Sequence, residues 1–212
     1  MGSVWWPSIR NTGQPVGDGR TAYDVFHMNS VGSLGGSRVQ VSLRHTDAVY
    51  RIDKPTGNIV WKLGGTPRPE SLTVNNDPVF ASGSTISGQH DARLLPDGSL
   101  TLYDNGTNRN RPPRAVRYAI NPFAKTATLL ESISDPGASS SLCCGSARRL
   151  SGGDWVISWG GDPLITEQTS SGNRVFALSL DPSVFSYRAD PVLPGVVSAS
   201  ALRAGMNAQF PR

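Results

Sequence analysis

A loose internal repeat is the feature of this sequence that most limits its fold. Three units begin at His27, at His90 and near Ser146, which gives spacings of 63 and 56 residues. Each unit reads as four short strands joined by turns rich in Gly, Asp and Ser, a pattern typical of a β-propeller blade. Common blade repeats are shorter, at about 40–50 residues. The excess lies in Thr66–Ser87 and around Thr107–Arg114, which we expect to be long loops.

Apolar and polar side chains alternate within these units, as they do in strands with one buried face. Val39, Val41 and Leu43, for example, fall at every second position. The expected strands are HMNSVG, VQVSLR, AVYRID and NIVWKL in the first unit, and HDARLL, LTLYDN, AVRYAIN and TATLLESI in the second. In the third unit they are GSARRL, WVISWG, RVFALSLD and SYRADPV. No segment keeps a helical period over several turns, which favours an all-β fold with little helix.

The predicted architecture is therefore about three four-stranded blades of an incomplete β-propeller. We expect blades at about 23–87, 88–140 and 141–195, with 1–22 the tail of a preceding blade or loop. Residues 196–212 would form a C-terminal tail, irregular or adding a strand elsewhere. Propellers typically close with four to eight blades. The chain is thus expected to belong to a larger propeller, to self-associate, or to receive missing blades from another chain.

Composition and charge exclude several classes of protein. No apolar run approaches the roughly 20 residues of a membrane span, and no basic segment followed by an apolar stretch marks a secretory signal near the start. The net charge is only +4, and no basic face with interleaved aromatic residues predicts nucleic-acid binding. The densest basic stretch, Arg109–Arg117, is either a solvated loop or a basic rim that attracts an anionic substrate.

The two cysteines are adjacent, and their sequence leaves two interpretations open. Cys143 and Cys144 form either a vicinal disulfide or a pair of reduced thiols. Two aromatic residues at the ends of second strands, Tyr103 and Trp159, either pack in the core or line a phenol pocket. Asn105 begins an Asn-Gly-Thr glycosylation pattern, which carries no weight without a secretory context.

Only three histidines occur, and two of them open successive units. Residues at equivalent positions of neighbouring blades converge on a propeller axis, so we expect His27 and His90 to lie close together. His45 follows Arg44, and strand alternation would turn it to the opposite face, in a structural role. No cysteine or carboxylate shares a metal-ligand spacing with these histidines, so no metal site is expected.

Four short segments of the sequence resemble segments of a known enzyme family. FHMNSV, SLRHTDAVYRIDKPTGNIVWKLGG, SGQHDARLLPDGSLTLYDNG and CCGSARRLSGGDWVISWGG are similar, in this order, to segments of the arylsulfotransferases. The resemblance covers about Tyr23 to Arg188. It implies a six-bladed propeller that needs no cofactor and lies outside the cytoplasm, secreted or periplasmic. It also implies transfer of a sulfuryl group from a phenolic sulfate ester to a phenol acceptor through a sulfated histidine.

The same resemblance suggests roles for individual residues. His90 matches the family's nucleophilic histidine, and His27 and Asn29 match a His-x-Asn pair that contacts the sulfate. Arg44 matches a sulfate-binding arginine. The family uses a further histidine from an earlier blade, which has no counterpart here, so activity of this polypeptide alone stays open.

These residue types suit the implied chemistry. Neutral imidazole is a good nucleophile near pH 7. A departing phenol, with a pKa near 10, needs a proton donor such as His27. The planar fork of Arg44 can hold two sulfuryl oxygens, and Asn29 can donate a further hydrogen bond.

Two other functions remain as alternatives. A non-catalytic propeller could bind ligands or proteins with the same face. A propeller hydrolase or a quinoprotein-like dehydrogenase is less favoured, because a calcium-bound quinone calls for acidic residues at the axis and the sequence shows no such cluster.

Overall fold

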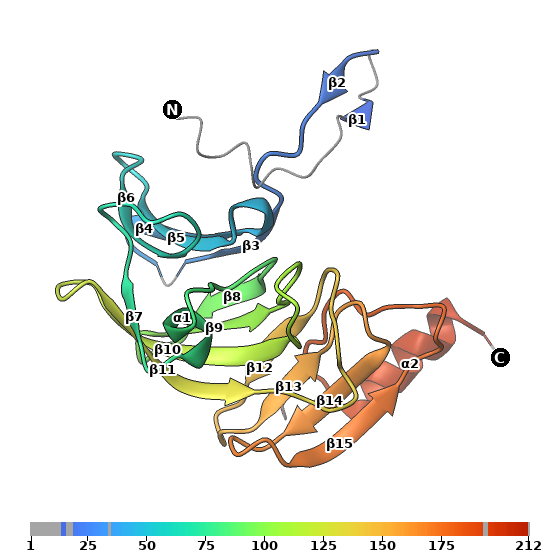
Figure 1. The fold of residues 1–212 in the computed structure, drawn as a ribbon. Coiled ribbons are helices and arrows are strands. Elements are labelled where there is room, and N and C mark those ends of the chain that lie inside the picture. Colours follow the sequence, from blue (N-terminus) through green and yellow to red (C-terminus); the bar gives the residue numbers. More distant parts are fainter. Residues whose placement is uncertain (1–13, 16–18, 34, 193–194, 212) are drawn as a thin grey trace.

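Three β-sheets arranged as a fan make up the body of the protein. The computed structural model describes residues 14–15, 19–33, 35–192 and 195–211. The sheets follow one another along the chain and meet face to face (Figure 1). Within the described residues the fan does not close into a ring. The prediction of an all-β, propeller-type fold with about three blades is confirmed. None of the helices in the described part of the chain has the length and apolar character to cross a bilayer.

The first sheet contains the four strands expected from the first unit, in simple up-and-down order. Its strands are β3 (Met28–Gly32), β4 (Arg38–Leu43), β5 (Ala48–Asp53) and β6 (Ile59–Gly64). The hairpin between β5 and β6 turns at residues 53–58, where the side chain of Asp53 accepts a 2.7 Å hydrogen bond from the Thr56 hydroxyl. A single 3-10 turn, η2 (Arg44–Thr46), separates β4 from β5.

The second sheet contains its four expected strands and one more. The expected strands are β8 (His90–Leu94), β9 (Ser99–Asp104), β10 (Arg114–Asn121) and β11 (Thr126–Ile133). The additional strand, β7 (Thr73–Asn75), runs parallel to β11 at the outer edge. Residues 66–87, expected to be a loop, thus hold β7 and the short helix α1 (Pro78–Ala81). Asp77 caps this helix, and Pro78 occupies its first position, where a missing N–H costs nothing.

The third sheet also has four strands, but one expected strand was wrong and another strand was missed. Its strands are β12 (Ser146–Arg149), β13 (Trp155–Ser158), β14 (Leu164–Gln168) and β15 (Arg174–Ser179). The segment SYRADPV forms no strand, and LITEQ, read as a polar connection, is β14. The polar residues of β14 interrupt the apolar alternation that predicts a strand. One of them, Thr166, is nevertheless buried, and its hydroxyl accepts a 2.9 Å hydrogen bond from the Trp159 indole.

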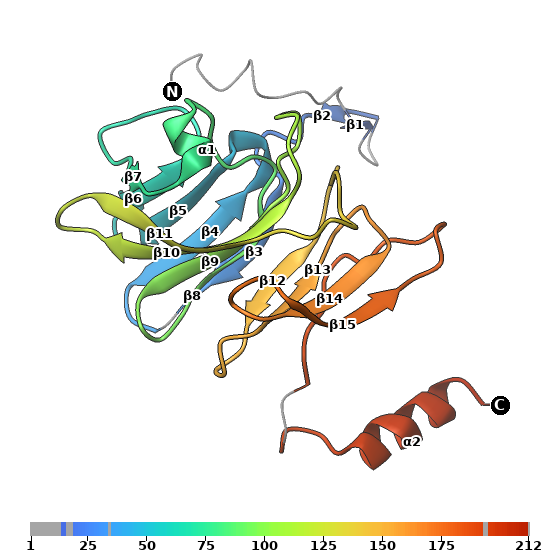
Figure 2. The same ribbon diagram turned by 60° about the horizontal axis from the view of Figure 1, so that its bottom comes forward.

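The described segments near the two ends of the chain form no part of the three sheets. Residues 1–22, expected to belong to a preceding blade or loop, fall mostly outside the described residues, apart from the pair β1 (Gln14–Pro15) and β2 (Thr21–Ala22). The C-terminal segment is neither irregular throughout nor a strand, because it forms helix α2 (Ala199–Gln209). Ser198 caps α2, and alanine-rich sequence favours helix. Figure 2 shows α2 standing apart from the sheets.

An apolar cluster fills each of the two interfaces between sheets. Tyr103 and Trp159 are fully buried in the second cluster, with ring centres 6.0 Å apart in an edge-to-face arrangement. They pack in the core, and the alternative that they line a phenol pocket is wrong. The first cluster includes Val49, Trp61, Leu63, Leu100 and Leu102, and the second includes Tyr103, Ala115, Trp155, Ile157 and Trp159.

The basic stretch Arg109–Arg117 is neutralised by acidic partners. The buried guanidinium of Arg114 lies between two carboxylates, with contacts of 2.9 Å to Asp77 and 3.0 Å to Asp104. Arg111 also donates to both oxygens of Asp104, at 2.8 Å each. Arg109 pairs with Asp47 at 3.0 Å. The interpretation of this stretch as a free basic rim is therefore wrong, since its cations hold loops together instead.

The buried Arg114 gives a prediction about stability. We expect Arg114→Leu to lower the free energy of unfolding by about 3–5 kcal/mol, because it leaves the buried carboxylate of Asp77 without its cation and removes one of the two cations beside Asp104. Urea denaturation followed by circular dichroism measures the change. Arg109→Leu is the matched control, and removing its partly exposed ion pair should cost at most about 1 kcal/mol. Equal losses in the two variants would show that the buried pair has no special role.

The outer strand β15 leads to a prediction about association. All its residues are exposed, including Val175, Phe176 and Leu178 at 60%, 53% and 44%. An exposed apolar edge strand tends to pair with another chain. We expect the isolated polypeptide to self-associate, and sedimentation velocity should show species larger than the monomer at rising concentration. A monomer at all concentrations would contradict this expectation.

Candidate functional site

His90 begins β8, the inner strand of the second sheet, and lies where all three sheets approach one another. β8 contacts β3 and β4 of the first sheet and β12 of the third. The pairing register between β8 and β9 shifts between His90 and Arg93, and Asp91 has a left-handed backbone with φ of 52°. This β-bulge re-aims the side chains around His90, as bulges near active sites commonly do.

The two neighbours of His90 anchor opposite sheets. The buried amide of Gln89 donates to the Leu43 carbonyl at 3.1 Å and to the Ala48 carbonyl at 3.0 Å, both in the first sheet. On the other side, the buried carboxylate of Asp91 accepts from the backbone N–H of Ala147 in the third sheet at 3.2 Å. These bonds fix the backbone of His90 between two blades.

Asp91 is also the centre of a cluster of arginines. Its carboxylate lies 3.1 Å from Arg93, 2.9 Å from Arg148 and 3.6 Å from Arg188. Burial raises the pKa of Asp91, while the charges of these three arginines act in the opposite direction. A buried carboxylate with several cations is a structural anchor, and it is too well paired to serve as a free base.

The imidazole of His90 is buried and held by two oxygen acceptors. Its Nδ1 lies 2.8 Å from the Gly88 carbonyl and 3.2 Å from the Asn105 side-chain oxygen. Because both partners only accept, Nδ1 must carry the proton and Nε2 the lone pair. Nε2 makes no hydrogen bond within the described part of the chain. Burial lowers the pKa of His90 from 6.5 to about 4, with smaller contributions from the charges of Arg44 and His27.

Asn105 positions His90 and is a functional candidate that sequence reasoning missed. Its amide nitrogen donates to the Ser141 hydroxyl at 2.8 Å and to the Cys144 carbonyl at 3.1 Å. These two bonds turn the amide oxygen toward His90. Asn105 is 1% exposed, so its glycosylation pattern is inaccessible in the folded chain. The one sequence feature that could have indicated this role is the position of Asn105 directly after the second strand of its unit.

Two carboxylates hold the loop that precedes His90. The side chain of Asp104 accepts from the backbone N–H of Ser87 at 3.0 Å, and Asp47 accepts from that of Gly88 at 2.8 Å. Gly88 has a φ of 60°, and a Cβ there would lie 2.4 Å from the Thr107 hydroxyl. Glycine is therefore required next to this site.

Asn29 lies in β3 and Arg44 in the turn η2 that follows β4, and both flank the same region. The Arg44 guanidinium donates from Nη2 to the Leu142 carbonyl at 2.7 Å, and its charge acts on His90. The Asn29 amide donates to the Gln89 carbonyl at 2.8 Å. Its buried side-chain oxygen has no partner among the described residues. One of its two amide hydrogens is thus already used, and its free oxygen offers an acceptor.

His27 is exposed and paired with a carboxylate that the sequence analysis did not single out. Its Nδ1 is in close contact with Asp24 Oδ2, and its backbone N–H donates to Asp24 Oδ1 at 2.9 Å. Burial would raise the pKa of Asp24, but hydrogen bonds and charge from His27 lower it. Because Asp24 occupies Nδ1, the Nε2 atom of His27 is left to exchange a proton. The three-residue spacing of Asp24 and His27 is the sequence feature that could have predicted this pairing.

Strand alternation was expected to turn His45 to the face opposite Arg44, but the structure places the His45 ring beside that of His27. Their ring centres lie 4.8 Å apart, and His45 Nδ1 lies 2.6 Å from the Asp24 carbonyl. Strand alternation fails here because β4 ends at Leu43 and His45 lies in the turn η2.

Asp24, His27 and His45 also form a group that could hold a metal ion, because one donor atom from each lies within 4.8 Å of the others. This corrects the expectation that no carboxylate accompanies the histidines. The Asp24 carboxylate already contacts His27 directly, and the imidazole of His45 already contacts the Asp24 carbonyl. We therefore describe the group as a hydrogen-bonded cluster.

Of the two interpretations of the adjacent cysteines, the structure contains the pair of free thiols. Burial and the neighbouring Cys143 raise the pKa of Cys144 to about 12. Cys144 therefore stays protonated near pH 7 and is a poor nucleophile. Cys144 contributes to the site through its backbone carbonyl, which accepts the hydrogen bond from Asn105.

The fan of sheets and the histidine-centred site define a propeller-type protein in which the charge of an arginine acts on a buried imidazole. A family model described as Arylsulfotransferase (ASST) matches residues 7–180. The chain therefore belongs to the arylsulfotransferase family. The resemblance inferred from the four sequence segments is confirmed. The search of curated proteins found no match.

Solved structures of similar shape are distant in sequence. A protein of unknown function from Bacteroides caccae is 13% identical, with a TM-score of 0.45 over 74% of this chain and 47% of that one. The β-propeller domain of Cps50 (Swd1) from Myceliophteria thermophila is 12% identical, with a TM-score of 0.41 over 72% and 43%. Hydrazine synthase from Kuenenia stuttgartiensis is 13% identical, with a TM-score of 0.33 over 73% and 49%. The chain spans about half the length of these structures.

The hydrogen bonds of His90 give a prediction about its protonation. In nitrogen–proton correlation spectra of the imidazole rings, we expect His90 as the Nδ1–H tautomer with a titration midpoint about 4. The unfolded chain takes up this proton near pH 6.5 and the folded chain only near pH 4, so stability should fall as pH falls through this window. His90→Gln should reduce that pH dependence. A midpoint near 6.5, the ordinary histidine value, would contradict the buried, neutral assignment.

Proposed function

We propose that the protein transfers a sulfuryl group from a phenolic sulfate ester to a phenol through a sulfated His90. The observation that supports this proposal most is the anchored imidazole of His90. Its Nδ1 proton is fixed by Gly88 and Asn105, and its pKa of about 4 keeps it neutral at pH 7. Its Nε2 lone pair is thus available for attack without prior loss of a proton.

The first half of the reaction forms the bond between His90 Nε2 and sulfur. The bond between sulfur and the phenolic oxygen breaks, and its electron pair leaves with the oxygen. His27, in its protonated form, gives its Nε2 proton to this oxygen, so the product is a neutral phenol. Asp24 contacts Nδ1 and holds the orientation of the His27 ring.

The second half reverses these steps with the acceptor. His27 takes the proton of the acceptor phenol as its oxygen attacks sulfur. The bond between Nε2 and sulfur breaks, and its electron pair returns to His90. Both histidines then regain their starting states, and no outside donor of electrons or protons is needed.

Arg44 and Asn29 are proposed to bind the sulfuryl oxygens. One nitrogen of Arg44 donates to the Leu142 carbonyl, which fixes the side chain and leaves other N–H groups for substrate. Negative charge accumulates on the oxygens in the transition state, and preorganised donors stabilise it there. The second amide hydrogen of Asn29 can add one more bond.

The assembly and location of the protein are part of the same proposal. We propose that the sheets are blades at about 23–87, 88–140 and 141–195 of a larger propeller, whose other blades complete the site. Secretion or periplasmic location follows from the family, and fractionation of the producing cells tests it. A non-catalytic propeller that binds ligands with this face is the alternative.

Substitutions test the proposed roles in an assay that measures phenol release from a chromogenic aryl sulfate with a phenol acceptor. In the full-length protein, His90→Ala should lower turnover by about 10³-fold or more, because no other side chain replaces the nucleophile. Arg44→Lys should lower turnover by about 10- to 100-fold while the substrate still binds, since a point charge replaces a bidentate fork.

Arg109→Lys is the matched control for Arg44→Lys, and it should leave turnover within about twofold because its ion pair is partly exposed. Unchanged turnover in His90→Ala would remove His90 from the mechanism. Aryl sulfate binding without turnover in the unmodified full-length protein would favour the non-catalytic propeller.

A further inference from the structure

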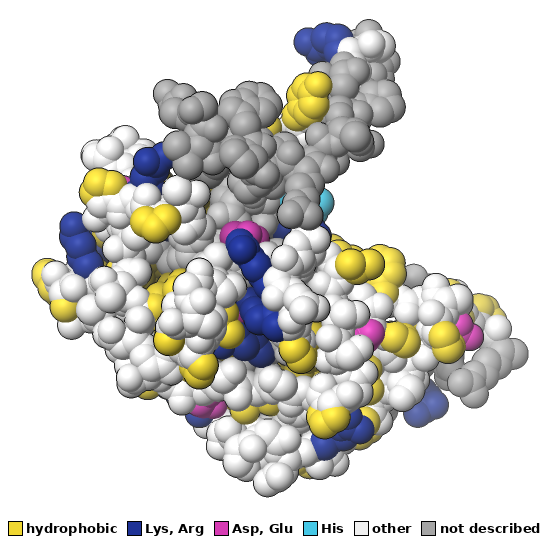
Figure 3. Space-filling view, viewed as in Figure 1, with side chains coloured by type: hydrophobic (Ala, Val, Ile, Leu, Met, Phe, Trp, Pro, Cys, Tyr) yellow, Lys and Arg dark blue, Asp and Glu magenta, His cyan; other side chains and the backbone are white. Residues whose placement is uncertain are grey.

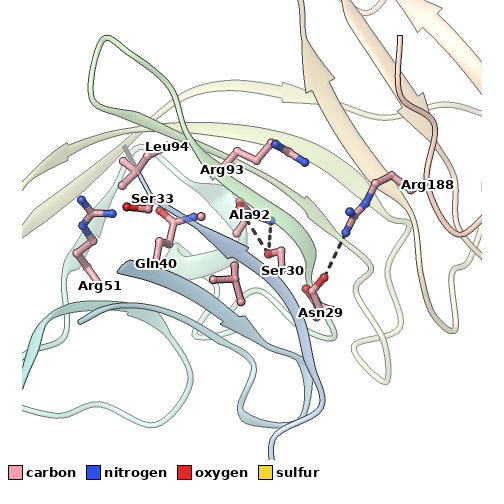
Figure 4. Close-up of a pocket in the computed structure, with 11 residues that line it drawn as sticks. Asn29, Ser30, Ser33, Gln40, Arg51, Ala92, Arg93, Leu94 and Arg188 are labelled. Atoms are coloured by element: carbon pink, nitrogen blue, oxygen red, sulfur yellow. Dashed lines mark hydrogen bonds between the residues drawn. The ribbon is translucent and has the colours of Figure 1, made fainter. Parts of the chain in front are cut away.

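A polar pocket of about 250 Å³ lies between the first and second sheets. Strands β3 and β8 form its walls, and β4 and β5 contribute Gln40 and Arg51 (Figure 4). Three arginines line it, namely Arg51, Arg93 and Arg188. No acidic side chain is among the described residues that line it.

Gln40 is the most unusual residue of this pocket. It is 1% exposed, and neither its amide nitrogen nor its amide oxygen has a hydrogen-bond partner in the described part of the chain. Leaving a buried amide unsatisfied costs about 1–3 kcal/mol per group. The same face of this sheet carries Val49 and Trp61 in the apolar cluster, so an apolar side chain would pack at position 40 at lower cost.

Arg51 pairs with Gln40 in the register of β4 and β5. Its Nη1 is buried and has no hydrogen-bond partner among the described residues. Burial and the nearby charge of Arg38 lower the pKa of Arg51, but arginine remains protonated. The residue therefore presents an uncompensated cation to the pocket.

Arg93 and Arg188 supply positive charge at the other end of the pocket, where Figure 4 shows their side chains approaching each other. Both share the single carboxylate of Asp91, at 3.1 and 3.6 Å. Arg188 also donates to the backbone carbonyl of Asn29 at 3.2 Å. The positive charge on the pocket walls thus exceeds the negative charge beside them.

We propose that this pocket binds a small oxyanion, either inorganic sulfate or phosphate or the anionic end of a small organic molecule. Guanidinium groups and a primary amide are the donors that suit such oxygens. The pocket is below the roughly 300–1,000 Å³ of drug-sized ligand sites, and its polar lining does not suit an aromatic ring. The pocket shares Asn29 with the proposed sulfuryl site, but neither His90 nor Arg44 lines it, and the inference does not depend on the proposed sulfuryl transfer.

Positive charge also gathers on the surface of the molecule. On the face in Figure 3, Lys and Arg side chains gather in the hollow beneath the first sheet, with an acidic side chain beside them. Such a field raises the local concentration of anions near clefts.

Titration calorimetry of the full chain with sodium sulfate and with sodium phosphate tests the proposal, against sodium chloride at equal ionic strength. Acetate at the same ionic strength tests the organic anion. Arg51→Met should weaken the binding of the favoured anion by about tenfold or more, since a charged hydrogen bond is lost. Arg38→Met removes the same charge from outside the pocket lining and should change affinity by less than about twofold.

Gln40→Leu separates a binding role from a structural one. We expect it to lose anion affinity and to raise the thermal midpoint without anion, because an unsatisfied buried amide is removed. Arg44→Met should leave binding at this pocket unchanged. Absence of binding by every probe, or loss of binding in Arg44→Met but not in Arg51→Met, would overturn the proposal.

Discussion

A β-bulge at the start of β8 is the constraint on which the rest of the site depends. Residues two apart in a regular strand share a face, yet Gln89 and Asp91 reach opposite sheets because the register shifts after His90. The left-handed backbone of Asp91 stores strain, and the hydrogen bonds of Gln89 and the ion pairs of Asp91 hold it in place. His90 therefore sits on a backbone clamped from both sides.

A buried ion pair also holds the backbone next to His90 in place. Arg114 fixes Asp104, which in turn holds the loop before His90 through the backbone of Ser87. Breaking a buried ion pair costs more free energy than forming one gains. The pair therefore fixes the position of the residues it joins. Charge is therefore buried near the site, while the imidazole of His90 itself stays neutral at pH 7.

Sequence reasoning recovered the sheets better than the links between them. Strand alternation and turn residues predict the eight strands of the first two units, because each has an apolar side facing a neighbour. β14 and α2 were missed, since one carries polar residues in a buried strand and the other carries helix propensity without an apolar core face. The partners of the histidines, Asp24 and Asn105, depend on turns and loop closure, which no local pattern encodes.

The central claim is that His90 accepts the sulfuryl group, and mass spectrometry of the trapped intermediate tests it most directly. The full-length protein, mixed with an aryl sulfate in the absence of acceptor and quenched at alkaline pH, should gain the mass of one SO₃ group. Peptide mapping should place that group on His90, and a phenol added before the quench should remove it. An unmodified protein that nevertheless turns over substrate, or a sulfuryl group on another residue, would contradict the account.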